Sequence, residues 1–373
     1  MSALKQMALG AAFLLALVGS PGNGRACNVP VFRYALERWP PDAYQVVLFH
    51  RETLTPEQKA LVEPLEKAAR DGGANLAVAR VNLAEGAPDA MQALWKAQPN
   101  PSMPWLVVRY PPAHQTAPPA WAGPLAAEAV RTLVDSPVRR ELVRRLARGD
   151  SVVWLVLESG GKEQDDAIVR LLETESRSLE KTLRLPEPSP DDPRMRSDLP
   201  LKIVFSTLRL ARSDPAEQTL VNLLLRWDAK LPTLAEPMVF AIIGRGRSMP
   251  PLVGKEIRAD VVGKVAAFLT EACNCEVKAL NPGFDLLIAA DWDALIEGRL
   301  VKDPELPPLT GLSQFAVAAT DKPTTPLTAT NSAPEPAERG GLVRNLLLVL
   351  GIGAAVLAAG TFVLKSRGAK TPP

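Results

Sequence analysis

Apolar and polar positions alternate along the middle of the chain in a way that predicts strands followed by helices. Short apolar runs are typical of buried strands, and the longer segments between them show the spacing of amphipathic helices. Thr55 and Pro56 suit the cap and the first residue of one such helix. We expect strands over 45–50, 75–83 and 105–110, helices over 56–70 and 89–97, and a helical stretch from a turn at 121–123 to about 148.

The same order of elements begins again after residue 150. Glu236-Pro237 leads into an apolar strand much as Met103-Pro104 leads into the strand at 105–110, and Arg245-Gly246-Arg247 reads as a hairpin turn. The proline-rich stretch 186–200 is expected to be a loop inside this second unit. The expected elements are strands over 152–157, 201–208, 238–243 and near 252–253, and helices over 162–183, 214–228 and 260–272.

The N-terminus has the pattern of an export signal. Lys5 precedes an apolar run over 7–19, which is the length of a signal-peptide core and too short for a bilayer span. Small residues before Cys27 favour cleavage after Ala26, which makes 1–26 a signal peptide. Two alternatives remain: an uncleaved anchor, and a lipoprotein in which the Cys27 thiol is acylated.

The C-terminus has the pattern of a membrane anchor. The run 346–364 contains no charged side chain and covers about 28 Å as a helix, close to the hydrocarbon thickness of a bilayer. A buried core helix is the alternative, but a basic tail at 365–373 follows and a proline-rich tract at 301–341 precedes. Positive residues stay in the cytoplasm. We therefore expect a single transmembrane helix at 342–364, a flexible stalk at 301–341, and nearly all the mass outside the cytoplasm.

Composition narrows the functions that such a protein can have. With 43 Lys and Arg against 41 Asp and Glu, the net charge is +2, which predicts no affinity for nucleic acid. Only 2 histidines occur, so a histidine-rich metal site or a dispersed hydrolase site is disfavoured. The expected partners are the membrane and other membrane or extracytoplasmic proteins, and no cofactor is expected.

The order of elements resembles the thioredoxin fold over roughly 44–148. The resemblance rests on YQVVLFHRETLTPEQ, the first strand and its helix, and on PSMPWLVVRYP, a proline-led strand. It implies a cis proline at Pro104. It also implies a Cys-x-x-Cys pair at the places occupied here by Leu54 and Glu57, so thiol exchange by the family's mechanism is lost.

A second, more divergent copy of the same fold is expected over about 151–277. The resemblance places a second cis proline at Pro237. Ser159, Gly160 and Gly161 stand where its Cys-x-x-Cys would follow the first strand. The full expectation is an α/β protein with two thioredoxin-like domains in tandem, at 27–150 and 151–300, plus the C-terminal transmembrane helix.

The three cysteines allow several kinds of chemistry. Cys27 paired with Cys273 or Cys275 would form a structural bridge, as exported proteins readily do. A Cys273–Cys275 bridge would be strained and easily reduced, which suits disulfide exchange. The two thiolates, with Cys27 as a third ligand, could instead hold a soft ion such as Cu(I).

Other candidate residues have simpler explanations. His50 ends the first strand but has no nucleophile beside it, and His114 lies in a proline-rich turn. Asp285, Asp291 and Asp293 suit caps or turns better than a cation site. A basic run at 139–148, containing Arg139, Arg140, Arg144, Arg145 and Arg148, suits a solvated helix face.

No catalytic set emerges from these positions, so we expect a non-enzymatic protein. The leading hypothesis is a membrane-anchored extracytoplasmic binding or scaffolding protein built on redox-inactive thioredoxin-like domains. The alternative hypothesis is a thiol–disulfide exchange or copper-handling protein that uses Cys273 and Cys275.

Overall fold

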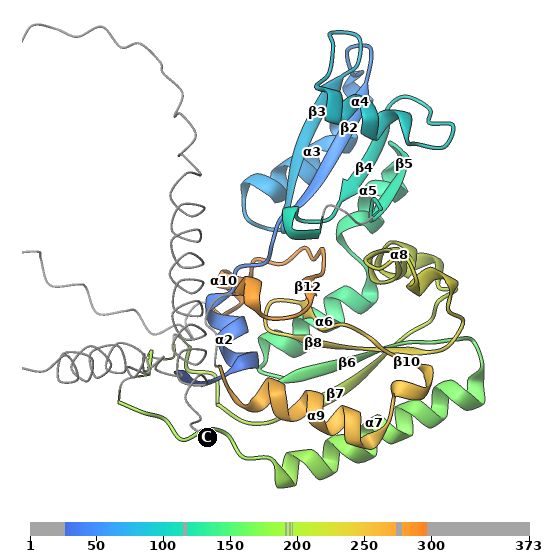
Figure 1. Ribbon diagram of the computed structural model, residues 1–373. Helices are drawn as coiled ribbons and strands as arrows, with labels where there is room; N and C mark the ends of the chain where they lie inside the picture. Colours follow the sequence, from blue (N-terminus) through green and yellow to red (C-terminus); the bar gives the residue numbers. More distant parts are fainter. Residues whose placement is uncertain are drawn as a thin grey trace, which may run out of the picture. The chain divides into compact units, whose positions relative to one another are not determined.

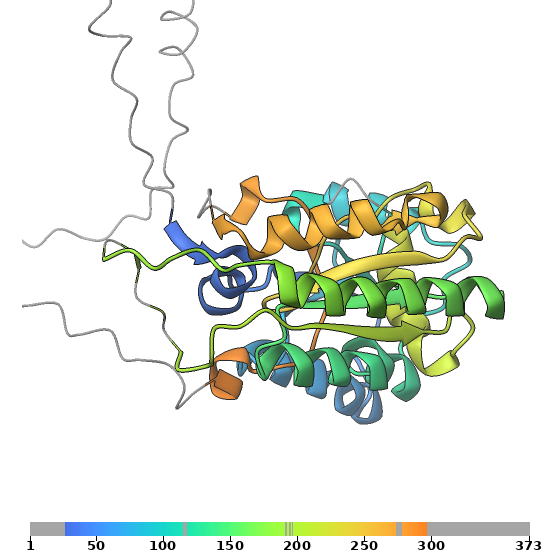
Figure 2. The same ribbon diagram turned by 90° about the horizontal axis from the view of Figure 1, so that it is seen from below.

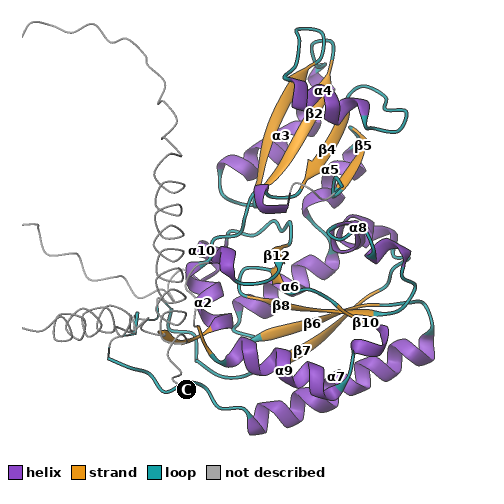
Figure 3. Cartoon of the chain, in the orientation of Figure 1, coloured by secondary structure: helices purple, strands orange, loops and turns teal. Residues whose placement is uncertain are grey.

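The computed structural model of the chain describes residues 27–296, apart from 115–117, 191, 194, 196 and 274–277. It is a mixed α/β protein of sheets and helices (Figure 3). Within these residues, no helix has the length and apolar character needed to cross a membrane. The signal peptide, stalk, membrane helix and tail expected at 1–26, 301–341, 342–364 and 365–373 lie outside the described residues.

The first sheet has four strands in the order β3-β2-β4-β5. Its central strand β2 is parallel to β3 and antiparallel to β4, which in turn is antiparallel to β5. The strands are β2 (Tyr44–His50), β3 (Leu76–Asn82), β4 (Trp105–Arg109) and β5 (Trp121–Pro124). Residues 121–123, expected to form a turn, therefore belong to a strand.

The two faces of the first sheet are covered unequally. On one face, Val46 and Leu48 of β2 pack in the main core with α3 (Pro56–Arg70) and α5 (Ala127–Val134). On the other face, Val47 and Phe49 pack with buried Val107. The other side chains around them are only partly buried, and several come from α4 (Asp89–Lys96), which has no fully buried residue. The second face is therefore the less protected one.

The second sheet repeats the topology of the first around β6 (Val152–Leu157). This strand is parallel to β7 (Phe205–Leu210) and antiparallel to β8 (Met238–Ile243). The sheet runs in the order β12-β9-β8-β6-β7, with β10 paired to β8. Its short strands are β9 (Arg247–Ser248), β10 (Leu252–Val253) and β12 (Phe284–Asp285). The turn that joins β8 to β9 covers 244–246, so Arg247, expected within the turn, belongs to β9.

Alternate residues of β6 point into two different cores, because successive side chains of a strand face opposite ways. Val153 and Leu155 belong to the core that the two sheets share, whereas Trp154 belongs to a separate core. Figures 1 and 2 show the helices on both faces of this sheet. They are α6 (Pro137–Ala147) and α8 (Gln218–Arg226) on the shared-core side, and α7 (Lys162–Thr182) and α9 (Ala259–Thr270) on the other.

The N-terminal segment packs on the second sheet. It comprises β1 (Cys27–Pro30) and α2 (Val31–Arg38), and β1 pairs with β11 (Ala272–Cys273). Phe32 and Ala35 of α2 lie in the same core as Trp154. Inside α2, Arg33 Nε lies 2.7 Å from Glu37 Oε1, and both side chains are buried. Arg33 Nη2 donates to Ser197 Oγ over 2.8 Å, which ties the segment to the loop before β7.

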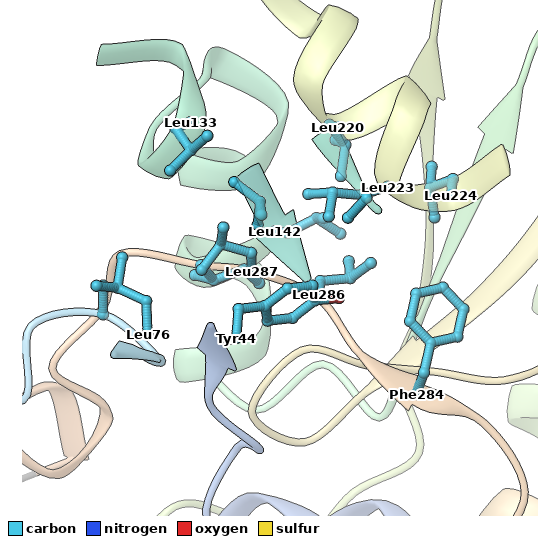
Figure 4. Close-up of a cluster of buried hydrophobic side chains, with 14 of the residues drawn as sticks. Tyr44, Leu76, Leu133, Leu142, Leu220, Leu223, Leu224, Phe284, Leu286 and Leu287 are labelled. Atoms are coloured by element: carbon cyan, nitrogen blue, oxygen red, sulfur yellow. The ribbon is translucent and has the colours of Figure 1, made fainter. Parts of the chain in front are cut away.

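The C-terminal segment follows the second sheet in sequence but packs against the first. It completes the core shared by the two sheets. Figure 4 shows Leu286 and Leu287 from this segment beside Tyr44 of the first sheet, and Phe284 belongs to the same core. Asn75 accepts a hydrogen bond from Ile288 N over 2.8 Å. The segment ends with α10 (Trp292–Ile296), of which Trp292 and Ile296 are buried. The domain boundaries expected from the sequence, 27–150 and 151–300, do not include this arrangement. In the structure the N-terminal segment packs on the second sheet, and the C-terminal segment packs against the first.

The helical stretch expected up to residue 148 is in fact two helices. Ser136 caps α6 through its side chain, which accepts from Arg139 N, and Pro137 occupies the first helical position. The residue before a proline is driven into extended geometry, so a single helix could not continue through Ser136. The break turns α6 toward the second sheet, where Leu142 and Leu146 enter the shared core.

Candidate functional site

A small groove opens at the start of α3, where the chain leaves β2. Its volume is about 290 Å³. His50, at the end of β2, and the loop residues that follow it form one side, and Met103 and Pro104 form the other. The Met103–Pro104 peptide bond is cis. The groove therefore lies at the place where the resemblance implies a redox site.

The side chains at the start of α3 form a closed cap and not a reactive pair. Thr55 N donates to Gln58 Oε1 over 3.0 Å, and Gln58 N donates to Thr55 Oγ1 over 3.3 Å. This reciprocal arrangement satisfies two of the donors that a helix start leaves exposed. Leu54 is buried, and Glu57 is exposed with its pKa lowered by a hydrogen bond from Thr55. None of residues 51–58 is a cysteine.

The corresponding place in the second sheet, at the start of α7, is filled by an internal carboxylate. Asp165 Oδ1 accepts from Ser159 N and from Ser159 Oγ, each over 2.9 Å, and Asp165 Oδ2 accepts from Gly160 N over 3.0 Å. Asp165 is buried. A carboxylate near a helix N-terminus is favoured by the helix dipole. The turn at the start of α7 is therefore closed by hydrogen bonds to the protein's own carboxylate.

The expected cis proline of the second unit is not found. Met103–Pro104 is the one cis peptide bond among the residues that the structure describes, so the Glu236–Pro237 bond is not cis. In this unit Gly254 N donates to Pro237 O over 3.0 Å, one residue beyond the paired strands β8 and β10. The similarity of the two X-Pro-strand sequences therefore does not extend to the geometry of the bond.

Two of the three cysteines are brought together. Cys27 of β1 and Cys273 of β11 are directly opposite each other in the antiparallel pair. Cys273 is 1% exposed and packs in the core that contains Trp154. Cys275 lies outside the described residues.

A larger cleft, about 770 Å³, opens beside the N-terminal end of β2. Lys278 Nζ lies 2.9 Å from Asp42 Oδ1 and also contacts Asp285 Oδ2. Arg247 Nη1 lies 3.3 Å from Asp285 Oδ1. These opposite charges neutralise one another, so the cleft presents mostly apolar walls. Apolar side chains that line it include Ala43, Ala77, Pro111, Pro112, Trp227 and Pro282.

Sequence reasoning missed this charged cluster because its members are far apart along the chain. The sequence pattern predicts only a cap or turn role for Asp285 and a place in a hairpin turn for Arg247. In the structure, Arg247 Nη2 also donates to Asn281 O over 2.7 Å and to Gly283 O over 3.1 Å. One signal in the sequence could have revealed this cluster. Arg245 and Arg247 flank a single glycine at a tight turn, and buried arginines need hydrogen-bond acceptors from elsewhere in the chain.

The remaining candidates are structural. Asp291 caps α10 by accepting from Ala294 N over 2.9 Å, and Asp293 lies 2.7 Å from Arg245. The expectation that 139–148 is a solvated face is wrong for Arg139, which is buried. Only the backbone of His114 is described, in a short 3-10 turn. In the described part of the chain, no three His, Cys, Asp or Glu side chains gather as a metal site would require.

No protein-family model and no curated protein sequence matches the chain.

Proposed function

We propose that the chain is a non-catalytic, membrane-anchored extracytoplasmic binding or scaffolding protein built on two redox-inactive thioredoxin-like domains. The fold assignment is supported by the strand arrangement that the two sheets share. In each, a central strand is parallel to the next strand in sequence and antiparallel to the third, with a helix between the first two.

One observation supports the proposal that the first domain has no redox function. The groove at the start of α3 keeps its opening and its cis Pro104, yet the residues that line it include no thiol. Exchange of disulfides requires a thiolate that a partner can reach. A groove that is open but chemically inert suits the binding of a polypeptide without reaction.

The two sites differ in what they can bind. The groove of the first domain is open, whereas its counterpart in the second domain is filled by Asp165. We therefore assign partner binding to the first domain and a supporting role to the second. The less protected face of the first sheet, with partly buried Met91, Trp95 and Trp105, adjoins Met103 and enlarges the apolar area near the groove.

Site-specific cross-linking in cells tests the binding role. A photoreactive amino acid replaces exposed Thr53 in the groove of the full-length chain, and the matched control places it at exposed Glu163, at the start of α7. We expect a cross-linked adduct of one defined mass from position 53 and none from position 163. Identical adducts from both positions, or none from position 53, would contradict the proposal.

A thiol-exchange assay separates the proposal from its alternative. The full-length chain in detergent is added to insulin and dithiothreitol, and we expect the rate with dithiothreitol alone. The burial of Cys273 supports this expectation, because a partner disulfide cannot reach a sulfur in a packed core. An accelerated rate that Cys273→Ala or Cys275→Ser removes would favour the exchange protein instead.

The membrane anchor has its own test. Protease added to intact cells, or to spheroplasts of a Gram-negative host, is expected to degrade the residues before the 342–364 segment, while an epitope added after Pro373 stays protected. Release of the chain by carbonate washing would contradict a spanning helix.

A further inference from the structure

The pairing of β1 with β11 places two cysteines where a covalent bond between them is feasible. In an antiparallel ladder, directly opposed residues have Cα atoms about 4.5 to 5.5 Å apart. Disulfides form at Cα separations of about 4.4 to 6.8 Å. Cys27 and Cys273 are such an opposed pair.

The backbone on both sides of this pair is held in place by other contacts. Val31 N donates to Glu271 O over 3.1 Å, just beyond the two-stranded pairing. On the outer side, Asn28 N donates to Asp192 Oδ1 over 2.8 Å. The pairing is irregular between Cys27 and Pro30, and contacts on both sides of this irregularity hold β1 in place without a bond between the cysteines.

The surroundings of Cys273 would protect a disulfide at this position from reduction. Its side chain is 1% exposed and lies in the core with Trp154 and with Phe32 of α2. Reduction requires a thiolate to attack one of the two sulfurs in line, so burial of one sulfur slows the reaction.

We propose that Cys27 and Cys273 form a disulfide that fastens the N-terminal segment to the second sheet, and that this bond excludes both lipidation of Cys27 and a Cys273–Cys275 redox pair. The two thiols lose two protons and two electrons. A disulfide of an oxidising protein in the exported compartment accepts them and becomes two thiols, through a mixed disulfide that the second cysteine displaces. The inference stands apart from the binding role, since either can fail alone.

Peptide mapping of the full-length chain tests the pairing directly. The protein is extracted from membranes in detergent with N-ethylmaleimide present, so that thiols are blocked before they can rearrange. Trypsin leaves Cys273 and Cys275 on one peptide, because no Lys or Arg separates them. The Cys275→Ser variant therefore resolves which cysteine is used, and we expect its Cys27 peptide to remain linked to the Cys273 peptide until reduction.

Three mapping results would overturn the proposal. They are maleimide on Cys27 without reduction in the Cys275→Ser variant, a Cys273–Cys275 bond in the natural sequence, and a fatty acyl group on Cys27. Each assigns the Cys27 sulfur to a different chemical state, so the peptide masses distinguish them.

Stability gives a second readout. A bond that closes so long a loop should raise Tm by roughly 5 to 15 °C, and reduction should remove this gain. If the bond exists, the Cys27→Ala/Cys273→Ala double variant melts at the temperature of Cys273→Ala alone, because either change breaks the same link. Losses in Tm that add, or a Cys275→Ser control that melts as low as Cys273→Ala, would contradict the pairing.

Discussion

The Tyr110 hydroxyl donates a hydrogen bond to Leu223 O over 2.6 Å, inside the core shared by the two sheets. Tyr110 follows β4 of the first sheet, and Leu223 lies in α8 beside the second. Tyr44 makes a similar link, donating to Asp285 O over 2.7 Å, and its ring lies 5.6 Å from that of Tyr110. Two buried tyrosines thus join the first sheet to elements that follow it by more than a hundred residues.

We expect Tyr110→Phe to destabilise the whole described unit and not only one sheet. The variant leaves the Leu223 carbonyl buried without its donor, which costs about 1 to 3 kcal/mol in the free energy of unfolding. Urea denaturation followed by circular dichroism should show one transition with a lower midpoint and an unchanged slope. Two separate transitions in the natural sequence would show instead that the sheets unfold independently.

The same two tyrosines predict a loss of stability at alkaline pH. Burial raises the pKa of both Tyr44 and Tyr110 above the usual value near 10. The folded state therefore keeps protons that the unfolded state releases, so stability is fully present below about pH 10 and is lost above it. The slope is about 1.4 kcal/mol per pH unit for each tyrosine.

The Tyr44→Phe/Tyr110→Phe double variant provides the comparison for that pH dependence. Its free energy of unfolding should fall less steeply than that of the natural sequence between about pH 10 and 11.5, although it is less stable at pH 7. Tyr34 is present in both proteins, so its contribution cancels. Parallel pH curves for the two proteins would refute a role for Tyr44 and Tyr110.

We expect substitution of Arg139 to lower the free energy of unfolding much more than substitution of its neighbour Arg140. Arg139 Nη1 donates to Leu133 O over 2.7 Å and to Leu287 O over 3.2 Å, and burial lowers its pKa to about 10, so it stays charged at neutral pH. We expect Arg139→Met to cost about 3 kcal/mol or more, because several buried carbonyls lose their donor. The control is Arg140→Ala, which breaks only an exposed pair with Asp135 and should cost at most about 0.5 kcal/mol. Similar urea midpoints for the two variants would contradict this account.

Asp165 and Asp166 offer a comparable test at the start of α7. Asp165→Ala removes the acceptor of three hydrogen bonds and should lower the free energy of unfolding by about 1 to 3 kcal/mol. Asp166→Ala removes exposed pairs with Lys162 and Arg209 and should change stability far less. Thermal melts compare the two, and an equal loss would mean that Asp165 does not organise the turn.

The elements that the sequence pattern predicted best are those whose signals are local. The strands at 152–157 and 238–243 have the expected bounds because each is a continuous apolar run that ends at polar or turn residues. The helix at 56–70 was equally clear, since Thr55 and Pro56 together mark its start.

What the sequence pattern could not predict depends on partners far along the chain. The helix at 31–38 was missed because its buried Arg33 and Glu37 resemble surface charges, and their acceptor and donor at Ser197 lie 164 and 160 residues away. Arg139 resembled a solvated residue for the same reason, since Leu287 O is 148 residues distant. In the candidate site, the absence of thiols was evident from the sequence, but the filling of the second site by Asp165 required the fold.

The placement of β1 against β11 also sets an order in time. Among the described elements, β1 leaves the ribosome first, and its partner near residue 273 lies at the other end of the described chain. Until that partner arrives, the apolar side of α2 has nothing to cover it, and contacts so distant in sequence form slowly. The first described segment to be synthesised is therefore among the last to reach its place, and a truncated chain that lacks β11 would leave the apolar side of α2 exposed.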